Sequence, residues 1–286
     1  MKHLENKRIA VIGSGNMAGA MIGALLRNNE VNPDQIIASD PYPEQRNCVQ
    51  DKYGIQVTGD NQQAVKKADI VVLSVKPQVL PDVFSDLKGK IATGSLVFSI
   101  VAGMPISNIQ KGLSHKSVIR SMPNTPAQIS AGMTVWTDSD SVTESQREEV
   151  RTILEAMGKQ LYVEKEDALN MATAVSGTGP TYVFLLAEAL VDAAVHLGFS
   201  RRDARMIVLE TLKGSVKYAL QSELHLAQLR NMVTSPGGTS AEAIYQLEKG
   251  GMRTILSKAV WAAYQKSQLL GKKAEEPPDA PLSVEN

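Results

Sequence analysis

Short apolar runs and amphipathic segments alternate through the first half of the chain. The apolar runs have the length of buried strands, and the segments between them show helical spacing, including one that ends near Asn28 and one over about 143–157. Strands that alternate with helices form a mostly parallel sheet covered on both faces. The pattern therefore predicts an α/β domain with a doubly wound sheet over residues 1–164. The predicted strands are residues 8–12, 36–40, 54–58, 69–75, 96–100, 117–122, 132–136 and 159–163.

The pattern changes near Val163, after which the alternation typical of strands ends. Helical periodicity with short interruptions predicts an all-α domain over residues 165–271, and Ser176 to Pro180 should interrupt its first long helix. Residues 272–286 combine prolines with acidic residues, which predicts a disordered tail. The expected helices are residues 167–175, 180–197, 201–221, 224–232, 239–248 and 250–270.

One of these helical segments, residues 182–187, is apolar on nearly all sides. A helix of this kind is normally buried on most of its faces. A small helical domain offers few faces for that burial. We therefore expect the domain to form a homodimer, or a larger homo-oligomer built from one.

A glycine turn follows the first predicted strand and opens the first helix. Gly13-Ser14-Gly15-Asn16-Met17-Ala18 matches the fingerprint of a Rossmann-like domain, with alanine at the third glycine position. Such a turn holds the pyrophosphate of a dinucleotide on backbone amides at the start of the helix. The alternative is a strand-to-helix turn that binds no ligand.

Asp40 ends the second predicted strand, where the fingerprint places the residue that reads the adenine ribose. A carboxylate there accepts hydrogen bonds from the ribose hydroxyls and repels a 2′-phosphate, whereas Ser39 could help to bind that phosphate. We therefore expect NADH to be used well, and Asp40→Ser to shift the preference toward NADPH. The alternative is that Asp40 only opens a turn before Pro41.

Three further strand ends should contribute to the same cleft, since ligands of such sheets lie at the carboxyl ends of the strands. They are Ser74 to Pro77, Ile100 to Ala102 and Met122 to Thr125. Lys76 is open to a catalytic interpretation, but a solvated lysine held by the following proline is the better one.

The helical half contains a second glycine turn, Ser235-Pro236-Gly237-Gly238, followed by Thr239 and Ser240. Thr239 precedes Glu242 by three residues, which is the spacing of a capping box and predicts Thr239 as the N-cap of a helix. The first amides of that helix could bind a small carboxylate, with the Ser240 hydroxyl beside them. The alternative is a helix start without a ligand.

Five motifs resemble those of pyrroline-5-carboxylate reductases and occur in the same order. They are Gly-x-Gly-Asn-Met at 13–17, Val-Lys-Pro at 75–77, Met-Pro-Asn-Thr-Pro at 122–126, Gly-x-Gly-Pro-x-Tyr at 177–182 and Ser-Pro-Gly-Gly-Thr at 235–239. The resemblance covers residues 8–270. It implies reduction of the ring C=N of 1-pyrroline-5-carboxylate to L-proline with NADPH or NADH, the last step of proline biosynthesis.

The resemblance also implies roles for individual residues. Glu223, Gly238, Thr239 and Ser240 would line the substrate site. Ser240 would be catalytic, with its hydroxyl on the imine nitrogen, and either Ser240 or a bound water would relay the proton. The cofactor contacts would be Ile12, Gly13, Ser14, Gly15, Asn16, Met17, Asn61, Ser74, Val75, Lys76, Pro77, Ile100, Val101 and Ala102.

Three positions depart from the pattern of that family. Ser240 replaces the usual second threonine but keeps the hydroxyl. Met232 replaces an asparagine that touches the cofactor in some members. Ser39-Asp40 differs from members with a hydroxyl residue just before the proline, which puts their preference for NADPH in doubt for this chain.

Two other functions remain open at this stage. One is another imine or β-hydroxyacid reductase, although the hydroxyacid enzymes use a lysine in the helix after their Gly-x-Gly motif, and Gly177 to Tyr182 contains none. The other is a cofactor-binding regulator without activity. The complete turn at Ser235 to Ser240 argues against that second possibility.

Composition narrows the choice of partners. Lys and Arg total 30, as do Asp and Glu, so charge gives no case for binding nucleic acid or an anionic membrane. Cys48 is the single cysteine, which suits a reducing compartment, and the four histidines lack metal-ligand spacing. No apolar run has the length of a signal peptide or a membrane span. We therefore expect a cytoplasmic protein without a metal.

Overall fold

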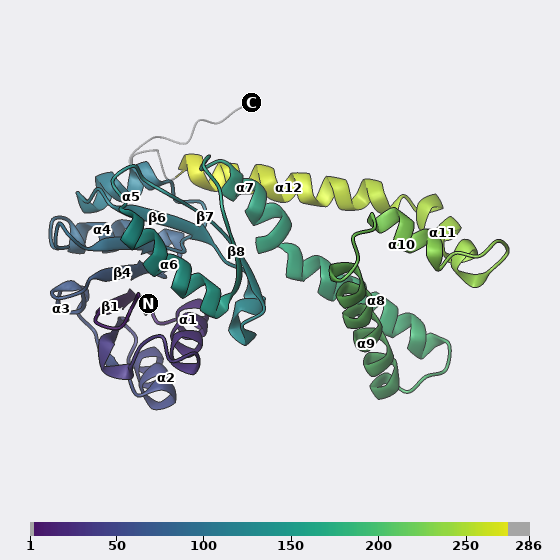
Figure 1. The fold of residues 1–286 in the computed structure, drawn as a ribbon, viewed down its shortest axis with the longest axis horizontal. Coiled ribbons are helices and arrows are strands. Elements are labelled where there is room, and N and C mark those ends of the chain that lie inside the picture. The colour runs from purple at the N-terminus through teal and green to yellow at the C-terminus, as the bar shows by residue number, and fades with distance from the viewer. Residues whose placement is uncertain (1–2, 274–286) are drawn as a thin grey trace, which may run out of the picture. The chain divides into compact units, whose positions relative to one another are not determined.

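The computed structural model describes residues 3–273 (Figure 1). The chain divides into two units. Among the described residues, the first unit, the sheet unit, contains those up to Thr178 and those from Ala263 to Lys273. The second, the helical unit, spans Gly179–Ala262. The fold class is therefore confirmed as a doubly wound α/β sheet followed by helices.

The sheet unit is built on eight strands in the order β3-β2-β1-β4-β5-β6-β7-β8. All eight predicted strands are present. The sheet is parallel from β3 through β6, but β7 runs antiparallel to β6, and β8 is parallel to β7. The strands are β1 (Ile9–Ile12), β2 (Ile36–Ser39), β3 (Gln56–Thr58), β4 (Ile70–Leu73), β5 (Leu96–Ser99), β6 (Val118–Met122), β7 (Gly132–Asp138) and β8 (Gly158–Tyr162).

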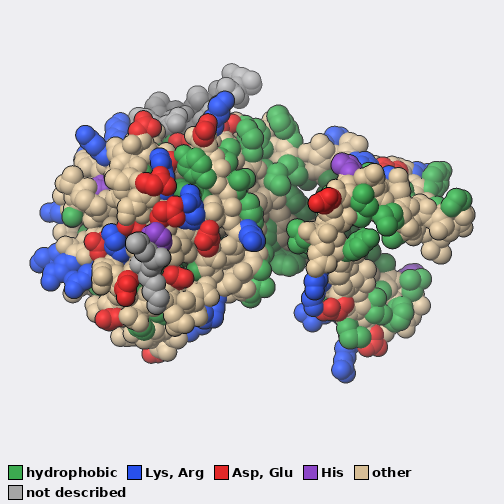
Figure 2. All heavy atoms as spheres, viewed as in Figure 1, with side chains coloured by type: hydrophobic (Ala, Val, Ile, Leu, Met, Phe, Trp, Pro, Cys, Tyr) green, Lys and Arg blue, Asp and Glu red, His purple; other side chains and the backbone are tan. Residues whose placement is uncertain are grey.

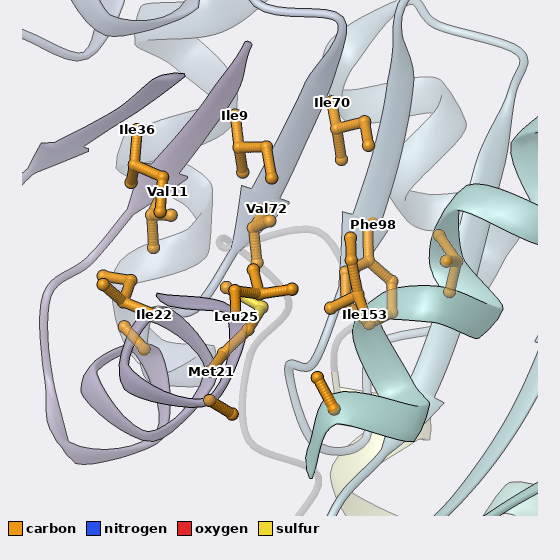
Figure 3. Close-up of a cluster of buried hydrophobic side chains, with 14 of the residues drawn as sticks. Ile9, Val11, Met21, Ile22, Leu25, Ile36, Ile70, Val72, Phe98 and Ile153 are labelled. Atoms are coloured by element: carbon orange, nitrogen blue, oxygen red, sulfur yellow. The ribbon is translucent and has the colours of Figure 1, made fainter. Parts of the chain in front are cut away.

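Helices cover both faces of this sheet. Successive strand residues point to opposite faces, so Val11 joins one core with Phe98 and Ile153, whereas Ile12 joins a second core on the other face (Figure 3). This double burial explains why the strands read as continuous apolar runs. The helices are α1 (Asn16–Arg27), α2 (Pro43–Tyr53), α3 (Asn61–Val65), α4 (Leu80–Leu87), α5 (Ile106–Leu113) and α6 (Glu144–Met157), with short 3-10 turns η1 (Pro33–Gln35), η2 (Pro77–Val79) and η3 (Thr125–Ile129).

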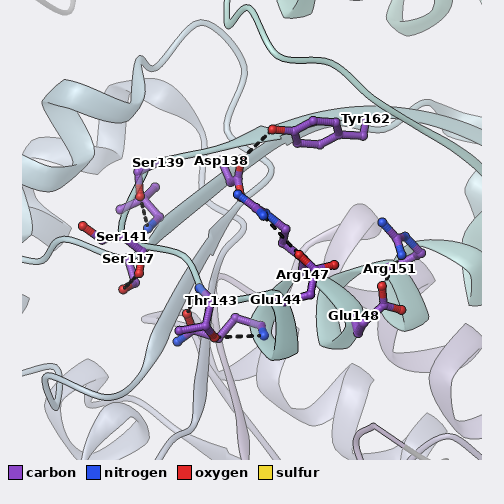
Figure 4. Close-up of polar contacts among 12 residues, drawn as sticks. Ser117, Asp138, Ser139, Ser141, Thr143, Glu144, Arg147, Glu148, Arg151 and Tyr162 are labelled. Carbon is purple, nitrogen blue, oxygen red and sulfur yellow. Dashed lines mark hydrogen bonds and ion pairs between the residues drawn. The ribbon is translucent and has the colours of Figure 1, made fainter.

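A polar network holds the β8 edge of the sheet (Figure 4). Asp138 accepts hydrogen bonds from Arg147 Nε at 2.5 Å and from the Tyr162 hydroxyl at 3.0 Å. The Tyr162 ring also packs edge-on against Trp136, with centroids 4.9 Å apart. Burial, and then the hydrogen bond to Asp138, raise the pKa of the Tyr162 hydroxyl.

Two helical segments beyond the sheet also belong to the sheet unit. They are α7 (Ala168–Ala172) with the π turn η4 (Thr173–Gly177), and the last part of α12 (Met252–Lys273). The Tyr264 hydroxyl donates to Asp167 at 3.2 Å, and the Ser267 hydroxyl donates to the Asn170 side-chain oxygen at 2.9 Å. These contacts carry the sheet unit past residue 164, where the sequence predicted a boundary.

The helical unit contains the other predicted helices. They are α8 (Gly179–His196), α9 (Arg201–Leu220), α10 (Leu226–Met232), α11 (Thr239–Lys249) and the first part of α12. The predicted interruption at Ser176 to Pro180 takes the form of the π turn and a bend at Thr178. The predicted tail begins inside α12 at residues 272 and 273, and residues 274–286 lie outside the described part of the chain.

Many large apolar side chains of the helical unit are exposed, and they are visible over its surface in Figure 2. The run Ala168–His196 is long and apolar enough to cross a membrane by length and composition, with a mean hydropathy of 1.3. The expectation that no run approaches a span was therefore wrong by this measure. Only 11% of the 18-residue stretch that has this hydropathy is buried. The core of a single chain therefore does not explain its apolar surface.

Candidate functional site: a dinucleotide edge and a serine turn

Four predicted cofactor segments meet at one edge of the sheet. Ile12 is in register with both Ser39 and Leu73, and Leu73 is in register with Ser99. Backbone hydrogen bonds continue beyond these strand ends, from Gly13 N to Ser39 O at 2.7 Å, from Ser74 N to Ile12 O at 2.9 Å and from Ile100 N to Leu73 O at 3.1 Å. The turns after β1, β2, β4 and β5 are therefore neighbours.

The turn after β1 has the shape that a pyrophosphate needs. Gly13 has a φ of +91°, and a Cβ there would lie 2.8 Å from the Ser74 carbonyl oxygen, so a side chain is excluded. Gly15 is the N-cap of α1, and a Cβ on Gly15 would meet no described atom within 4 Å. The space before the first amides of α1 is thus open to a phosphate. Ala18 is fully buried, which is consistent with a small residue at the third fingerprint position.

Asp40 stands directly after β2 but points into the protein. Its side chain is 8% exposed, and Oδ2 accepts from the Ser14 amide at 2.9 Å and from the Ser14 hydroxyl at 3.1 Å. Oδ1 accepts from the Tyr42 amide at 3.0 Å. This last bond closes a turn around Pro41. It fits the alternative interpretation, in which Asp40 opens a turn before the proline.

A second polar chain runs beside Asp40. The Ser39 hydroxyl donates to Asn61 Oδ1, and Asn61 Nδ2 donates to Asp86 Oδ2 at 3.0 Å. Arg46 lies close as well, because its Nη1 donates to the carbonyl oxygens of Asp40 at 2.7 Å and Pro41 at 3.0 Å. Ser39, Asp40 and Asn61 are thus together, as predicted, at the end of β2.

The turns after β4 and β5 present mainly backbone. Lys76 is exposed and precedes η2, which is consistent with a solvated lysine. Val101 is 2% exposed, and its amide donates to the Ser99 hydroxyl at 3.3 Å. Ser74, Val75, Pro77, Ile100 and Ala102 are half-buried.

Asn124, just after β6, links the Met-Pro-Asn-Thr-Pro motif to the residue that precedes the Gly-x-Gly-Pro-x-Tyr motif. Its Nδ2 donates to the Ser176 carbonyl oxygen at 3.3 Å, and its Oδ1 accepts from the Met133 amide at 2.9 Å. The π turn is thereby tied to β6 and β7. The sequence analysis included Asn124 as part of a strand end and of the Met-Pro-Asn-Thr-Pro motif, without a partner for its side chain.

Arg120, in the middle of β6, was missed. It is 4% exposed and donates to Glu166 at 2.7 Å, and the same carboxylate oxygen accepts from the Ile106 amide at 2.8 Å. A buried arginine must be paired, so Glu166 and Arg120 depend on each other. The signal in the sequence was a cation inside an apolar strand run.

The second glycine turn differs in one respect from its prediction. Helix α11 begins at Thr239 with Gly238 as its N-cap, and Thr239 makes no side-chain cap, so the predicted capping box was wrong. Gly237, with a φ of +70°, turns the chain, and the Gly238 amide donates to the Ser235 carbonyl oxygen at 3.0 Å. Since glycine occupies the N-cap, Thr239 moves into the first helical turn.

This turn leaves several polar groups accessible. Within residues 3–273, no hydrogen bond is recorded for the amides of Thr239 and Ser240 or for the Ser240 hydroxyl. Ser240 is half-buried and Thr239 is exposed. Glu223 is exposed between α9 and α10, and no hydrogen bond to the turn is recorded within the same range. Met232 ends α10 and is 63% exposed.

The chain is similar to known proteins along nearly its whole length. A family model for pyrroline-5-carboxylate reductase dimerisation matches residues 166–270, and one for NADP oxidoreductase, coenzyme F420-dependent, matches residues 8–103. The pyrroline-5-carboxylate reductase of Synechocystis sp. is 40% identical over 93% of this chain and 99% of its own length. That of Pseudomonas aeruginosa is also 40% identical, over 94% and 99%.

Solved structures give the same picture. The pyrroline carboxylate reductase of Plasmodium falciparum with NADP bound has a TM-score of 0.86 at 30% identity, with 93% of this chain and 98% of that one covered. The enzyme of Coxiella burnetii has a TM-score of 0.85 at 36% identity, with 92% and 98% covered. A prephenate dehydrogenase of A. aeolicus shares only the fold, with a TM-score of 0.53 at 16% identity.

Proposed function

The chain belongs to the pyrroline-5-carboxylate reductase family, and from that premise we propose how its residues divide the reaction. It is an oxidoreductase that uses NADH or NADPH to reduce 1-pyrroline-5-carboxylate to L-proline. The sheet unit holds the cofactor, and the turn at Ser235 to Ser240 holds the substrate. The observation that carries this assignment is the glycine turn at Gly13 to Asn16, which excludes side chains and opens onto the first amides of α1.

The structure fits a dinucleotide at this edge. A Cβ on Gly13 would collide with Ser74, whereas the space at Gly15 is open. The amides of Gly15, Asn16 and Met17 would hold the pyrophosphate, and the turns after β2, β4 and β5 would line the rest of the cofactor. When bound, the cofactor supplies the hydride, so the chain must orient the substrate and control one proton.

The substrate carboxylate would lie at the start of α11. The Gly238 amide is already used by Ser235, so the amides of Thr239 and Ser240 are the better donors. They carry the positive end of the helix dipole, which favours an anion. Glu223 would line the same site.

The Ser240 hydroxyl would donate to the ring nitrogen or accept from it, depending on whether the imine is protonated. A protonated imine is the better hydride acceptor, because its positive charge draws electron density from the ring carbon. Holding that N–H orients the ring, and hydride transfer to the protonated imine then gives the amine directly. An unprotonated imine would instead take its proton from the Ser240 hydroxyl, which would be reprotonated from solvent. A water bound beside Ser240 would serve the same purpose.

We also propose that the chain acts as a homodimer or a larger homo-oligomer in the cytoplasm. The helical unit exposes large apolar side chains, and most of it falls in the range that matches the dimerisation model. Burial between subunits would account for an apolar helix run such as Ala168–His196 without a membrane. The functional division into residues 1–164, which bind the cofactor, and 165–271, which bind the substrate and dimerise, belongs to the same proposal.

The test is consumption of NADH and NADPH by the purified protein with 1-pyrroline-5-carboxylate, with proline measured as the product. A panel of β-hydroxyacids, run in the oxidative direction, covers the alternative reductase. Proline formation above a no-enzyme control is expected. Oxidation of a hydroxyacid without proline formation would support the alternative, and cofactor binding with no turnover of either class would support a regulator.

A further inference from the structure

Asp40 connects the turn that would hold the pyrophosphate with the turn at the adenosine end of the proposed cofactor site. Both donors of Ser14, the amide and the hydroxyl, reach Oδ2 at 2.9 and 3.1 Å. Ser14 belongs to the turn after β1, and Asp40 to the turn after β2. The side chain thus forms a bridge between them, which we call the Asp40 clasp.

Few acceptor positions of the carboxylate remain for a ligand. An ionised carboxylate has about four lone-pair sites, and three of them are taken by Ser14 and by the Tyr42 amide. The backbone of Asp40 is fixed as well, since its amide donates to Thr58 O at 3.2 Å and its carbonyl oxygen accepts from Arg46 at 2.7 Å. The side chain is 8% exposed and cannot swing outward without breaking these bonds.

The Asp40 carboxylate is therefore held by donors from within the protein. Three donors surround the carboxylate, and the Arg46 guanidinium is bound to the carbonyl oxygen of the same residue. A 2′-phosphate would meet a carboxylate whose lone pairs are engaged by these donors and the positive Arg46 beside it, so the net repulsion would be weaker than from an unaccompanied carboxylate. Arg46 would also offer an attractive charge.

We infer that Asp40 is a positioning residue that holds the glycine turn in its binding shape, and that it does not decide between NADH and NADPH. By binding the Ser14 amide, Asp40 fixes the orientation of the Gly13–Ser14 peptide, and with it the path of the chain into Gly15 and Asn16. Those amides meet the pyrophosphate, which both cofactors share. The inference rests on the proposed cofactor site and replaces the expectation that Asp40 reads the ribose.

The test is titration of NADH and NADPH, without substrate, into the full-length protein and its variants Asp40→Ser, Asp40→Asn and Ser14→Ala, followed by cofactor fluorescence. Asp40→Ser should weaken both cofactors about tenfold, which corresponds to about 1.4 kcal/mol, and change the ratio of their Kd values less than about threefold. Ser14→Ala removes one of the three bonds and should weaken both cofactors about threefold. Asp34→Asn, in η1, is the matched control and should leave both Kd values unchanged.

Non-additivity gives a second readout that a general loss of stability does not produce. The double variant combines Ser14→Ala with Asp40→Ser. Asp40→Ser should weaken cofactor binding less in the Ser14→Ala background than in the wild type, because Ser14→Ala has already removed part of the clasp. If Asp40→Ser fails to fold, Asp40→Asn and Ser14→Ala decide the question.

Three results would overturn the inference. One is tighter NADPH binding with weaker NADH binding in Asp40→Ser, which would restore Asp40 as the ribose reader. Another is unchanged binding of both cofactors, which would mean that Asp40 only shapes the turn before Pro41. The third is full additivity with Ser14→Ala. Failure of the proposed function is distinguishable from all three, since the wild-type protein would then bind a cofactor without forming proline, or bind none.

Discussion

The sheet unit and the helical unit bury their apolar side chains to very different extents. Ile9 and Val72 on the sheet are 0% exposed, whereas Phe184 and Leu185 on α8 are each 65% exposed. Helix α11 has no buried residue at all. The sheet unit therefore carries its own core, whereas only a few residues of the helical unit, such as Ala204 and Val208, are buried within a single chain. Contacts with a second copy, as proposed above, would cover this exposed apolar surface.

Polar groups repeat this contrast. The sheet unit holds buried charges such as Arg120 and Asp40 only with partners, and within residues 3–273 no buried side-chain nitrogen or oxygen lacks a hydrogen bond. In the helical unit, the Ser240 hydroxyl and the amides of Thr239 and Ser240 make no hydrogen bond to any residue within 3–273. In the sheet unit, polar residues at the proposed cofactor site are already held by hydrogen bonds within the protein. The helical unit instead keeps polar groups available at the start of α11.

The largest expected effect is on assembly. Phe184→Glu places a charge on the exposed apolar face of α8 and should abolish the oligomer at micromolar concentration, because burying an unpaired charge costs several kcal/mol. Light scattering after size exclusion measures the mass. Ile129→Glu, on a side chain that is 78% exposed in the sheet unit, is the control and should keep the wild-type mass.

The next effect concerns the preformed turn. Gly13→Ala combines a φ of +91° with a Cβ 2.8 Å from a carbonyl oxygen, so it should weaken both cofactors at least about thirtyfold, or about 2 kcal/mol. Gly54→Ala is the matched control, because Gly54 also has a positive φ, +68°, but open space around it. It should lower the free energy of unfolding by about 1 kcal/mol and leave cofactor binding unchanged. Equal cofactor affinities for wild type and Gly13→Ala would place the cofactor elsewhere.

The accessible serine should matter for turnover rather than for the cofactor. Ser240→Ala should lower kcat/KM by a factor that corresponds to a loss of about 1.5–3 kcal/mol in transition-state stabilisation if the imine is charged. The Kd of the cofactor should change little. Steady-state kinetics and cofactor titration separate the two. Ser215→Ala on α9, whose hydroxyl donates to Thr211 at 2.8 Å, controls for loss of a helix serine. Unchanged kcat/KM in Ser240→Ala would remove Ser240 from the mechanism.

The smallest effect lies at the β8 edge of the sheet unit. Tyr162→Phe removes the hydrogen bond to Asp138 and should lower the free energy of unfolding by less than about 1 kcal/mol, because the side chain is 39% exposed.

The pH dependence of the same variant has a definite sign. The folded-state pKa of Tyr162 is raised above the ordinary value of 10.0, so the stability that the neutral hydroxyl contributes is fully present below pH 10 and is lost as pH rises further. Tyr162→Phe should therefore lose less stability than wild type above pH 10 in urea titrations. A steeper loss in the variant would contradict the assignment.

The sheet could be predicted from the sequence because its central strands are buried on both faces and several of them end at or near a glycine or proline. Gly13, Pro77 and Pro123 stop the apolar runs where β1, β4 and β6 end or shortly afterward. The antiparallel direction of β7 was not predicted, since apolar content is the same for either direction of a buried strand. The feature that distinguishes the two directions is the connection between neighbouring strands, which is short for an antiparallel pair and long for a parallel pair.

Hydrogen-bond partners across the chain could not be read from the sequence. Asp40 lies 26 residues from Ser14, and only the register of β1 and β2 brings the two turns together. The N-cap of the helix that begins at Thr239 was misplaced by one residue, because Gly238 and Thr239 are both acceptable N-caps and the preceding turn decides between them. Site positions were thus accessible to motif reasoning, but the partners of each side chain were not.

Helix α12 also constrains the order in which the chain can finish folding. Its last residues complete the sheet unit, as the approach of Leu270 to Gly103 and the bond from Tyr264 to Asp167 show. During synthesis from the N-terminus, the ribosome releases the sheet strands first and these closing residues last. A nascent chain that stops before Ala263 therefore leaves part of the sheet unit uncovered, and the helical unit must be translated in full before the sheet unit can be closed.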